Sequence, residues 1–308
     1  MSFQVIVDFS PVNELITSLY HYINFKQHRN FSLSKDWHNS VKTELHPHFA
    51  AELEDDRLEV LHRINLLVWQ CPGERTPKEF IKWLQDQPPG ELYERLAPWI
   101  NNIPGNLKEL RDRMVYLLSE WDVQYFQHID PRIIERLKED AKQKRDLISK
   151  VSSINLIEEA TNGIRIEPNE ILKTVFLIPQ YHCRPSTILD YFESMCTCLY
   201  PVKSTPNDYA NELPWELTVV TQALADENRL KILRFLNSGM QNFSAVQSYT
   251  GLAKSTTNHH LSILRRAGLI RTHYFGSKFI HQYSLREEGL GQMQNLINAY
   301  IRNNDGGV

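Results

Sequence analysis

The C-terminal third of the chain alternates short amphipathic segments with tight turns, and this pattern constrains the fold more than any other feature of the sequence. The segment AKSTTNHHLSILRRAG (253–268) starts with polar residues, continues with leucines at helical spacing and stops at Gly268. The segment NFSAVQSYTG (242–251) predicts a shorter helix, with Ser244 as its N-cap and Gly251 as its stop. Two helices joined by so short a turn predict a helix-turn-helix.

The segments on either side extend this unit. LTVVTQALADENRLKILRFLN (217–237) predicts two helices separated near Asp226, which is a suitable N-cap for the second helix. LIRTHYFGSKFIHQYSL (269–285) alternates in the manner of a β-hairpin, with the tripeptide GSK (276–278) in its turn. A helix-turn-helix followed by a hairpin predicts a winged helix-turn-helix domain over residues 215–303.

The last segment, EEGLGQMQNLINAYIRN (287–303), predicts a helix with one apolar stripe. Because a terminal helix this apolar needs a partner surface, we expect it to pack across a two-fold dimer interface, together with the helix near 217–224. The residues predicted in this interface are Leu217, Leu224, Leu290, Met293, Ile297 and Tyr300.

Charge is distributed unevenly along the chain. Nine Lys or Arg residues and no Asp or Glu occur between Asn228 and Arg286. Residues 211–308 contain ten basic and seven acidic residues, whereas residues 1–210 contain 24 basic and 30 acidic ones. The formal net charge of -3 therefore combines an acidic N-terminal part with a basic C-terminal part. This asymmetry predicts that only the C-terminal part meets a polyanion.

Three strings in the basic part carry a family resemblance. LADENRLKIL, STTNHHL and RRAGL occur in this order with the family's spacing, and the hairpin follows them. Residues 215–303 thus resemble the ArsR family of bacterial winged-helix repressors. The resemblance implies a homodimer on a near-palindromic DNA operator, with half-sites about one helical turn apart. The first two-thirds of the chain loosely resembles the extension that precedes this module in some Gram-positive relatives.

The start of the second helix of the helix-turn-helix, the recognition helix, is expected in the major groove. Asn258 offers an amide suited to adenine, while Ser255 and Thr256 offer hydroxyls for phosphates or base edges. Lys278 at the hairpin tip suits a backbone or minor-groove contact. The residues predicted to contact DNA are Lys254, Ser255, Thr256, Asn258, His259, Arg265 and Lys278, with Arg266 as a further source of phosphate contacts.

The adjacent histidines of this helix are expected to do different things. Consecutive helical residues point about 100° apart, so His259 and His260 do not share one site. We expect His259 on the DNA-facing side and His260 packed beside Leu261. The family usually has a serine at the position of Ala253, so this helix lacks a side-chain N-cap.

The sequence lacks the two metal sites that many ArsR relatives use. Residues 242–251 contain no Cys or His, and residues 285–308 contain no His. We therefore predict no metal and no cofactor for the module. A thiol or metal site at Cys183, Cys196 and Cys198 stays an alternative, because the last two share one face of a strand. Packing as small apolar residues explains these cysteines equally well.

Residues 1–205 predict a mostly helical regulatory or dimerisation domain. Helical spacing is clearest from Leu107 to Tyr125. Residues 163–202 carry β-branched and aromatic runs, which predict a small antiparallel β-meander, and the polar segment 206–214 predicts a linker. The expected fold class is α+β, mainly α. Further helices are expected near 10–24, 34–54, 56–70, 76–87 and 131–152.

Several function classes are disfavoured by composition. No run of 18 apolar residues and no signal-like start is present, and four cysteines in 308 residues fit a cytoplasmic protein without a membrane segment. No phosphate-binding glycine loop, nucleophile elbow or HExxH pattern occurs, so we do not expect an enzyme.

The sequence therefore predicts a homodimeric transcriptional regulator, acting as a repressor on double-stranded operator DNA. Two alternatives stay open. One is a protein-interaction or effector-sensing adaptor, whose N-terminal domain binds a partner or an unidentified small-molecule effector. The other is a thiol- or metal-responsive regulator that uses the three cysteines.

Overall fold

The computed structural model describes residues 3–25, 35–54, 61–204, 213–276 and 280–302. The chain divides into two compact units, and each unit is built from segments that are distant in the sequence. One, the N-terminal unit, comprises Val5–Asp146 and Lys173–Val202. The other, the winged unit, comprises Met1–Gln4, Leu147–Leu172 and Lys203–Val308. None of the helices in the described residues is both long and apolar enough to cross a bilayer.

This division differs from the domain boundary predicted near residue 205. Residues 147–172 precede that boundary in the sequence but pack within the winged unit. The reason is that strand β2 (Ile164–Glu167) pairs in parallel with β7 (Ile270–Phe275) of the hairpin. Composition marks a polar linker, but it does not reveal a strand that pairs with a much later segment. Most of the predicted linker, residues 206–212 of 206–214, lies outside the described residues.

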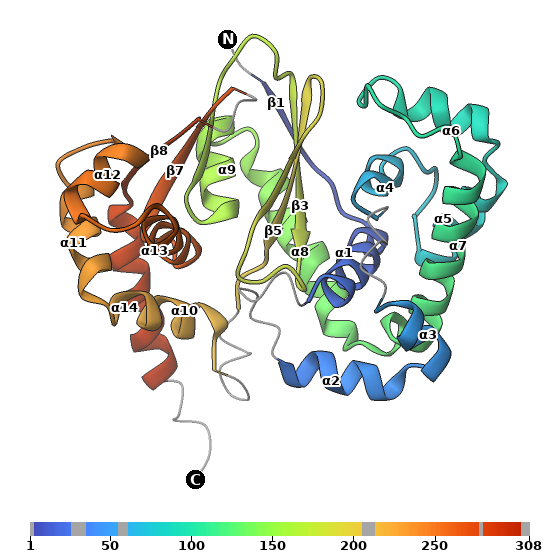
Figure 1. Cartoon of the computed structure of the whole chain (residues 1–308), viewed down its shortest axis with the longest axis horizontal. Coiled ribbons are helices and arrows are strands. Elements are labelled where there is room, and N and C mark those ends of the chain that lie inside the picture. The colour runs from blue at the N-terminus through green and yellow to red at the C-terminus, as the bar shows by residue number, and fades with distance from the viewer. Residues whose placement is uncertain (1–2, 26–34, 55–60, 205–212, 277–279, 303–308) are drawn as a thin grey trace. The chain divides into compact units, whose positions relative to one another are not determined.

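The N-terminal unit contains a four-stranded sheet in the order β1-β3-β5-β4. Its strands are β1 (Gln4–Val7), β3 (Thr174–Gln180), β4 (Ile188–Tyr191) and β5 (Met195–Pro201). In Figure 1 the sheet is seen nearly edge-on, with α1 and α4 to α7 on one side of it. The helices are α1 (Pro11–Ile23), α2 (Lys35–Glu44), α3 (Pro47–Glu52), α4 (Leu61–Val68), α5 (Pro77–Asp86), α6 (Pro89–Leu96), α7 (Leu107–Gln124), the 3-10 helix η1 (Phe126–His128) and α8 (Pro131–Leu147).

The predicted antiparallel meander is wrong in two respects. Strand β2 belongs to the other sheet, and β3 and β5 run parallel, from Thr174 opposite Met195 to Gln180 opposite Pro201. Among the described pairings of the predicted meander, β4 and β5 do form an antiparallel hairpin. Every residue of β5 is buried, as is every residue of β3 after the first. Continuous burial of this kind is typical of strands that are covered on both faces, as parallel strands are.

Most of the predicted helices of the N-terminal unit are confirmed, with differences at prolines. The segment predicted as one helix over 34–54 forms α2 and α3, because Pro47 starts a new helix. The Pro-Pro-Gly stretch after Gln87 separates α5 from α6, and Pro89 starts α6, a helix that was not predicted. Proline is tolerated at the first position of a helix, where no intrahelical partner for its missing N–H is needed. Strand β1 and helix α9 were not predicted.

The core of the N-terminal unit explains its tryptophans. Trp121 and Leu117 of α7 are completely buried, and the indole N–H of Trp121 donates to Ser18 Oγ at 2.9 Å. The other four tryptophans of this unit are partly buried against the same core, as expected of aromatic residues at helical spacing. These are Trp37, Trp69, Trp83 and Trp99.

The winged unit follows the predicted order of helices and hairpin. A four-stranded sheet in the order β2-β7-β8-β6 contains the hairpin, and helices α10 to α14 lie around its base (Figure 1). Ser244 is not the N-cap of α12, because the side chain of Asn242 accepts from the backbone N–H of Ala245 at 2.8 Å. The remaining elements are α9 (Ser153–Thr161), α10 (Trp215–Leu224), α11 (Glu227–Leu236), β6 (Gln241–Asn242), α12 (Phe243–Thr250), α13 (Lys254–Arg266), β8 (Ile280–Leu285) and α14 (Glu287–Arg302).

Candidate nucleic-acid interface

Helix α13 separates a polar outer face from an apolar inner face. Leu261 and Leu264 are 2% and 0% exposed and belong to the core of the winged unit. Thr257 is also buried, and its hydroxyl donates to the carbonyl of Ala253 at 3.1 Å. The helix itself carries no acidic residue. Its exposed side chains are those of Lys254, Ser255, Thr256, Asn258 and His259, five of the residues predicted to contact DNA.

The two adjacent histidines lie in different environments, as expected. His259 is exposed, whereas His260 is 6% exposed and its Nδ1 lies 3.8 Å from a carboxylate oxygen of Asp226. Burial lowers the pKa of His260, although the nearby Asp226 opposes this shift. His260 is therefore a packing residue that stays neutral near pH 7. No hydrogen bond to its Nδ1 is formed by the described residues.

The helices behind α13 are fixed by caps. Asp226 is the N-cap of α11, as predicted, and accepts from the backbone N–H of Arg229 at 3.0 Å. The guanidinium of Arg229 in turn donates to the carbonyls of Gln222 and Ala223 at 2.9 and 2.7 Å, at the end of α10. Gly251 ends α12 with a φ of +68°, a conformation that favours glycine. Ala253 precedes α13 without a side-chain cap.

The other predicted contact residues lie away from this outer face or outside the described chain. Arg265 is partly buried and donates to the hydroxyl of Tyr274 in β7 at 3.3 Å, which ties α13 to the hairpin. Arg266 is also partly buried, and burial lowers the pKa of its guanidinium. Lys278, predicted at the hairpin tip, lies outside the described residues.

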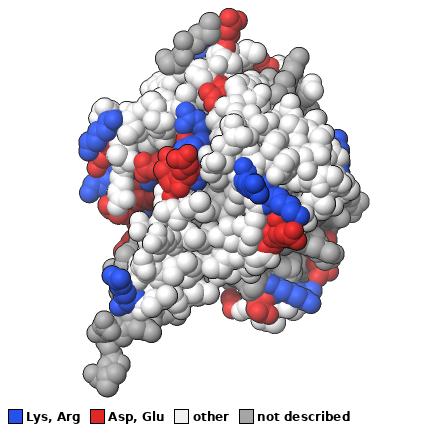
Figure 2. Space-filling view, turned by 90° about the vertical axis from the view of Figure 1, so that its left-hand side faces the viewer, with Lys and Arg blue, Asp and Glu red and all other residues white. Residues whose placement is uncertain are grey.

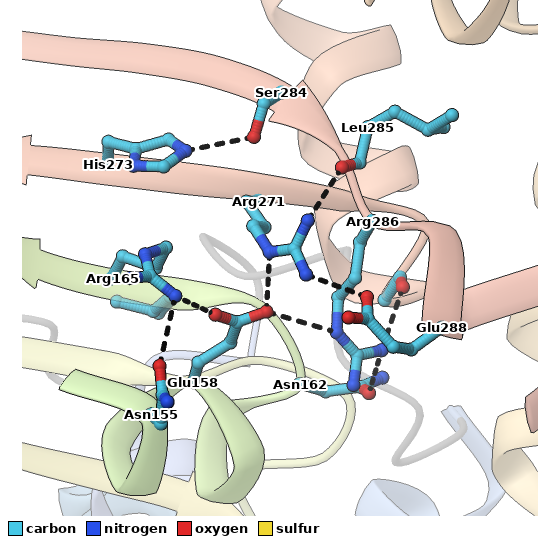
Figure 3. Close-up of polar contacts among 12 residues, drawn as sticks. Asn155, Glu158, Asn162, Arg165, Arg271, His273, Ser284, Leu285, Arg286 and Glu288 are labelled. Carbon is cyan, nitrogen blue, oxygen red and sulfur yellow. Dashed lines mark hydrogen bonds and ion pairs between the residues drawn. The ribbon is translucent and has the colours of Figure 1, made fainter. Parts of the chain in front are cut away.

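A network of ion pairs lies at the base of the hairpin (Figure 3). Glu158 of α9 accepts from Arg271 Nε of β7 at 2.6 Å and also pairs with Arg165 of β2. Arg271 further donates to the carbonyl of Leu285 at 2.9 Å and to Glu288 at 2.7 Å. Burial alone would raise the pKa of Glu158, but hydrogen bonds from the two arginines outweigh it and lower the pKa. Glu158 therefore carries a negative charge in contact with two arginines.

Arg286, directly after β8, extends the network towards α13 and α14. It is 4% exposed, and its Nε lies 3.7 Å from Glu158. Its Nη1 donates to Asn162 Oδ1 at 2.9 Å, and to the carbonyl of Gly268 and Oε1 of Gln292 at 3.1 Å each. One guanidinium thus joins the hairpin to the ends of α9 and α13 and to the start of α14.

The edge strand β2 is held by side chains as well as by its backbone. His273 of β7 bridges Glu167 of β2 and Ser284 of β8, with 2.9 Å between the paired atoms on each side. The network and this bridge were not found from the sequence, because their acidic members, Glu158, Glu167 and Glu288, lie outside the basic segment.

The acid-free segment of the sequence is therefore not free of acids in space. Arg271 and Arg286 contact Glu158, and Lys231 pairs with Glu227 at 2.7 Å. On the face that carries α11 and α12, basic and acidic side chains occur in small separate groups between large uncharged areas (Figure 2). At the start of α13, by contrast, Lys254 is exposed.

The residues predicted in a dimer interface differ in exposure. Leu217 is 8% exposed and belongs to the core of the winged unit. Leu290 is 41% exposed on α14, and Ile301 of the same helix is 65% exposed. The others are partly buried against the core: Leu224, Met293, Ile297 and Tyr300.

The cysteine-containing segment of the N-terminal unit is built for packing. Cys183, Cys196 and Cys198 are completely buried, and burial raises the pKa of the first two thiols. His182, next to Cys183, pairs through Nδ1 with buried Glu14 and lies 2.7 Å through Nε2 from the hydroxyl of Tyr125. Among the described residues, no three His, Cys, Asp or Glu side chains form a group that could hold a metal ion.

Comparison with known proteins connects this geometry to a family. The family model described as bacterial regulatory protein, arsR family, matches residues 226–272. The transcriptional repressor SdpR of Bacillus subtilis is 34% identical over 83 residues, which are 26% of this chain and 90% of the repressor. The chain belongs to the ArsR family. The matched residues 226–272 run from the cap of α11 through the helix-turn-helix into β7, so this part is an ArsR-type DNA-binding domain.

Solved ArsR-like structures align with about a quarter of the chain. An ArsR-like transcriptional regulator from Rhodococcus sp. RHA1 is 25% identical, with 27% of this chain and 76% of that one covered and a TM-score of 0.25. The homodimeric winged helix-turn-helix DNA-binding domain of a possible ArsR-family regulator from Mycobacterium bovis is 24% identical. It is covered to 82%, against 29% of this chain, with a TM-score of 0.23.

Proposed function

We propose that this ArsR-family protein is a homodimeric transcriptional repressor of the bacterial cytoplasm that binds a near-palindromic operator through α13. The observation that carries the proposal is the exposed row of Lys254, Ser255, Thr256, Asn258 and His259 at the start of a helix whose opposite face is buried. Side chains at the start of a recognition helix are those that reach base edges and phosphates.

Each member of the row has a distinct role in this proposal. Asn258 reads a base edge through its amide, and Ser255, Thr256 and His259 donate to bases or phosphates. Lys254 supplies charge to the phosphate backbone. Arg265 adds phosphate charge beside the hairpin, and Lys278 makes a contact at the hairpin tip.

Dimerisation is proposed through α14 and α10. Leu290 and Ile301 present apolar surface on α14 that one chain leaves exposed, and Met293, Ile297 and Tyr300 are only partly covered. Burial of such surface is the main favourable term in protein association. Repression is supported by the similarity to SdpR, whose name describes a transcriptional repressor.

The test is a mobility-shift titration of the full chain on DNA from its own promoter, at several salt concentrations. We expect a complex of two chains per operator that competitor DNA does not displace, with an affinity that falls as salt rises. A complex that forms equally on unrelated DNA, or no complex at all, overturns the proposal. Native mass spectrometry of the same samples gives the number of chains, and a monomer on DNA overturns the dimer.

A further inference from the structure

The winged unit contains a pocket on the side of α14 that faces α10. Its volume is about 380 Å³, which is within the range of about 300–1,000 Å³ typical of small-molecule sites. Val220 of α10 and Met293, Leu296 and Ala299 of α14 form an apolar wall. Polar residues also line it, from the end of α9, from the segment before α10 and from α10 itself: Asn162, Lys203, Ser204 and Glu216.

We propose that this pocket binds a small zwitterion with an apolar side chain, of the amino acid or short peptide class. Glu216 is the acceptor for the ammonium group. Its Oε1 accepts from the backbone N–H of Ser204 at 2.5 Å, whereas its Oε2 is buried without a hydrogen-bond partner among the described residues. A buried carboxylate oxygen in this position is stabilised most by a charged N–H donor.

Hydrogen-bond donors of the pocket indicate the chemistry of the other end of the ligand. The side-chain oxygens of Asn162 and Gln292 both accept from Arg286, so each amide has its NH₂ group left to donate to a ligand. Lys203 adds a positive charge to the pocket lining. Two amide donors and a cation suit a carboxylate, while Val220, Met293 and Leu296 suit an aliphatic side chain.

Residues that line the pocket also contact the end of the recognition helix. Asn162 and Gln292 share Arg286 with the carbonyl of Gly268, which follows the recognition helix. At Gly289 of the pocket, a Cβ atom would lie 2.2 Å from the same carbonyl, so α14 and the end of α13 are in direct backbone contact. A ligand that reorders Asn162 or Gln292 therefore changes the support of α13 relative to the hairpin.

The strongest competing occupant is a side chain of a second copy. Leu290 and Ile301, the exposed apolar residues of α14, do not line the pocket. A dimer contact through those two residues alone would leave the pocket open to a small molecule, whereas a contact that also uses Met293 would place the second copy at the pocket wall, and the variants below distinguish the two. The binding part of this inference is independent of the proposed function, and only its effect on DNA rests on it.

Three related probes test the ligand class by calorimetry on the full chain: leucine, isoamylamine, which lacks the carboxylate, and 4-methylpentanoate, which lacks the ammonium group. We expect leucine to bind at millimolar concentration or below, and each truncated probe to bind at least about tenfold more weakly. Equal binding of isoamylamine and leucine overturns the carboxylate site, and equal binding of 4-methylpentanoate overturns the ammonium site. Absence of binding by leucine overturns the proposal.

Variants locate the site. We expect Glu216→Gln to weaken leucine binding by about tenfold or more, because a charged acceptor is lost. Ala299→Leu fills the exposed side of the pocket and should abolish binding while the chain stays folded. The matched control is Glu227→Gln, since Glu227 is the first-turn glutamate of the next helix, is exposed and does not line the pocket. Leucine binding that survives both pocket variants overturns the site.

Two further measurements separate this inference from the proposed function. If Glu216→Gln and Ala299→Leu change only the monomer–dimer equilibrium and leucine does not bind, the pocket belongs to a second copy and the inference is wrong. The coupling is tested by titrating promoter DNA with and without leucine, because any effect on DNA affinity must equal the effect of DNA on leucine affinity. Leucine binding without such an effect overturns the coupling alone, whereas leucine binding by a chain that binds no DNA overturns the proposed function alone.

Discussion

Basic side chains are exposed at the start of the recognition helix but are paired and partly or fully buried at the base of the hairpin. At the start of α13, Lys254 is exposed and no described residue pairs with it. At the base of the hairpin, Arg271 and Arg286 are held by Glu158 and by carbonyl oxygens. Both regions belong to one basic segment of the sequence. Only the first region can exchange its interactions with water for interactions with DNA at little cost.

The basic residues of this segment therefore fall into two groups, those that support the fold and those whose charge is exposed. Arg286 acts as a support, because its guanidinium shares one Nη1 among three acceptors and is almost completely buried. Lys254 is a proposed contact, because its side chain is exposed to solvent. Variants that remove one role at a time should therefore separate stability from DNA affinity.

The largest effect is expected from Arg286→Ala. Removal of one partner of a buried, hydrogen-bonded charge pair costs about 3–5 kcal/mol, and here Asn162, Gly268 and Gln292 also lose their shared donor. Hydrogen exchange of the β7 and β8 amides measures this loss directly. The control is Arg234→Ala, because Arg234 is an exposed arginine of the same segment. Equal protection of the two variants would show that the network does not support the hairpin.

Asn258→Ala is the converse experiment. We expect DNA affinity to fall by an amount worth about 1–3 kcal/mol, because a bidentate contact to one base is lost. Amide protection should stay unchanged, since Asn258 is exposed. The measurement is a promoter titration by fluorescence anisotropy, with exposed Asn237→Ala as the control. If specificity at every base pair of the operator survives, Asn258 does not read a base.

The sequence predicted the winged part well because its signals are local. Asp226 caps α11, Gly251 ends α12, and leucines of α13 face the core, as expected from caps, stops and spacing. The N-cap of α12 was misassigned because Asn242 and Ser244 are both good caps. A capping residue predicts that a helix starts nearby, but two good capping residues close together do not determine the first residue of the helix.

The missed features all depend on pairing between distant segments. β2 pairs in parallel with β7, and β3 with β5. The sequence pattern of such strands does not differ from that of buried antiparallel strands, so the direction of pairing could not be predicted. The continuous burial of β5 was visible as the run MCTCLYP, which does not alternate, and this run was a signal against a solvent-exposed meander. The role of Glu158 was not visible at all, since it lies outside the basic segment.

Contacts between distant segments also limited the prediction of surface charge. Nine basic residues without an acid predicted a continuous cationic surface, but Glu158 and Glu288 reach Arg271 from outside the segment. Charge counted along the chain is therefore an upper bound on the charge available to DNA. The exposure of residues at the start of α13 agrees with the prediction, which selected them by their position at the start of the recognition helix rather than by total charge.

A smaller effect is expected from the pH dependence of His260. Burial lowers the pKa of this histidine in the folded chain, so below about pH 6.5 the unfolded chain binds more protons than the folded one. The stability of the winged unit should then fall as the pH falls from this value towards the folded pKa. His260→Gln should reduce this slope, and the part that remains is expected from His281, whose pKa is also lowered by burial. His259→Ala should keep the slope and weaken DNA binding. Hydrogen exchange between pH 5 and 7 measures the slope in each protein, and a promoter titration measures DNA binding. Equal slopes in the wild-type protein and His260→Gln would contradict the assignment.

The smallest effect, and the sharpest separation of the two regions, is expected from the salt dependence of DNA binding. Each lysine that contacts a phosphate contributes about one to the slope of log affinity against log salt. Lys254→Ala should lower this slope by about one, because the side chain is exposed at the start of α13. Lys231→Ala should leave it unchanged, because Lys231 is paired with Glu227 at 2.7 Å on α11. The two variants remove the same charge from the same basic segment, so equal slopes in both would mean that total charge, and not the exposed start of α13, determines the contact with DNA.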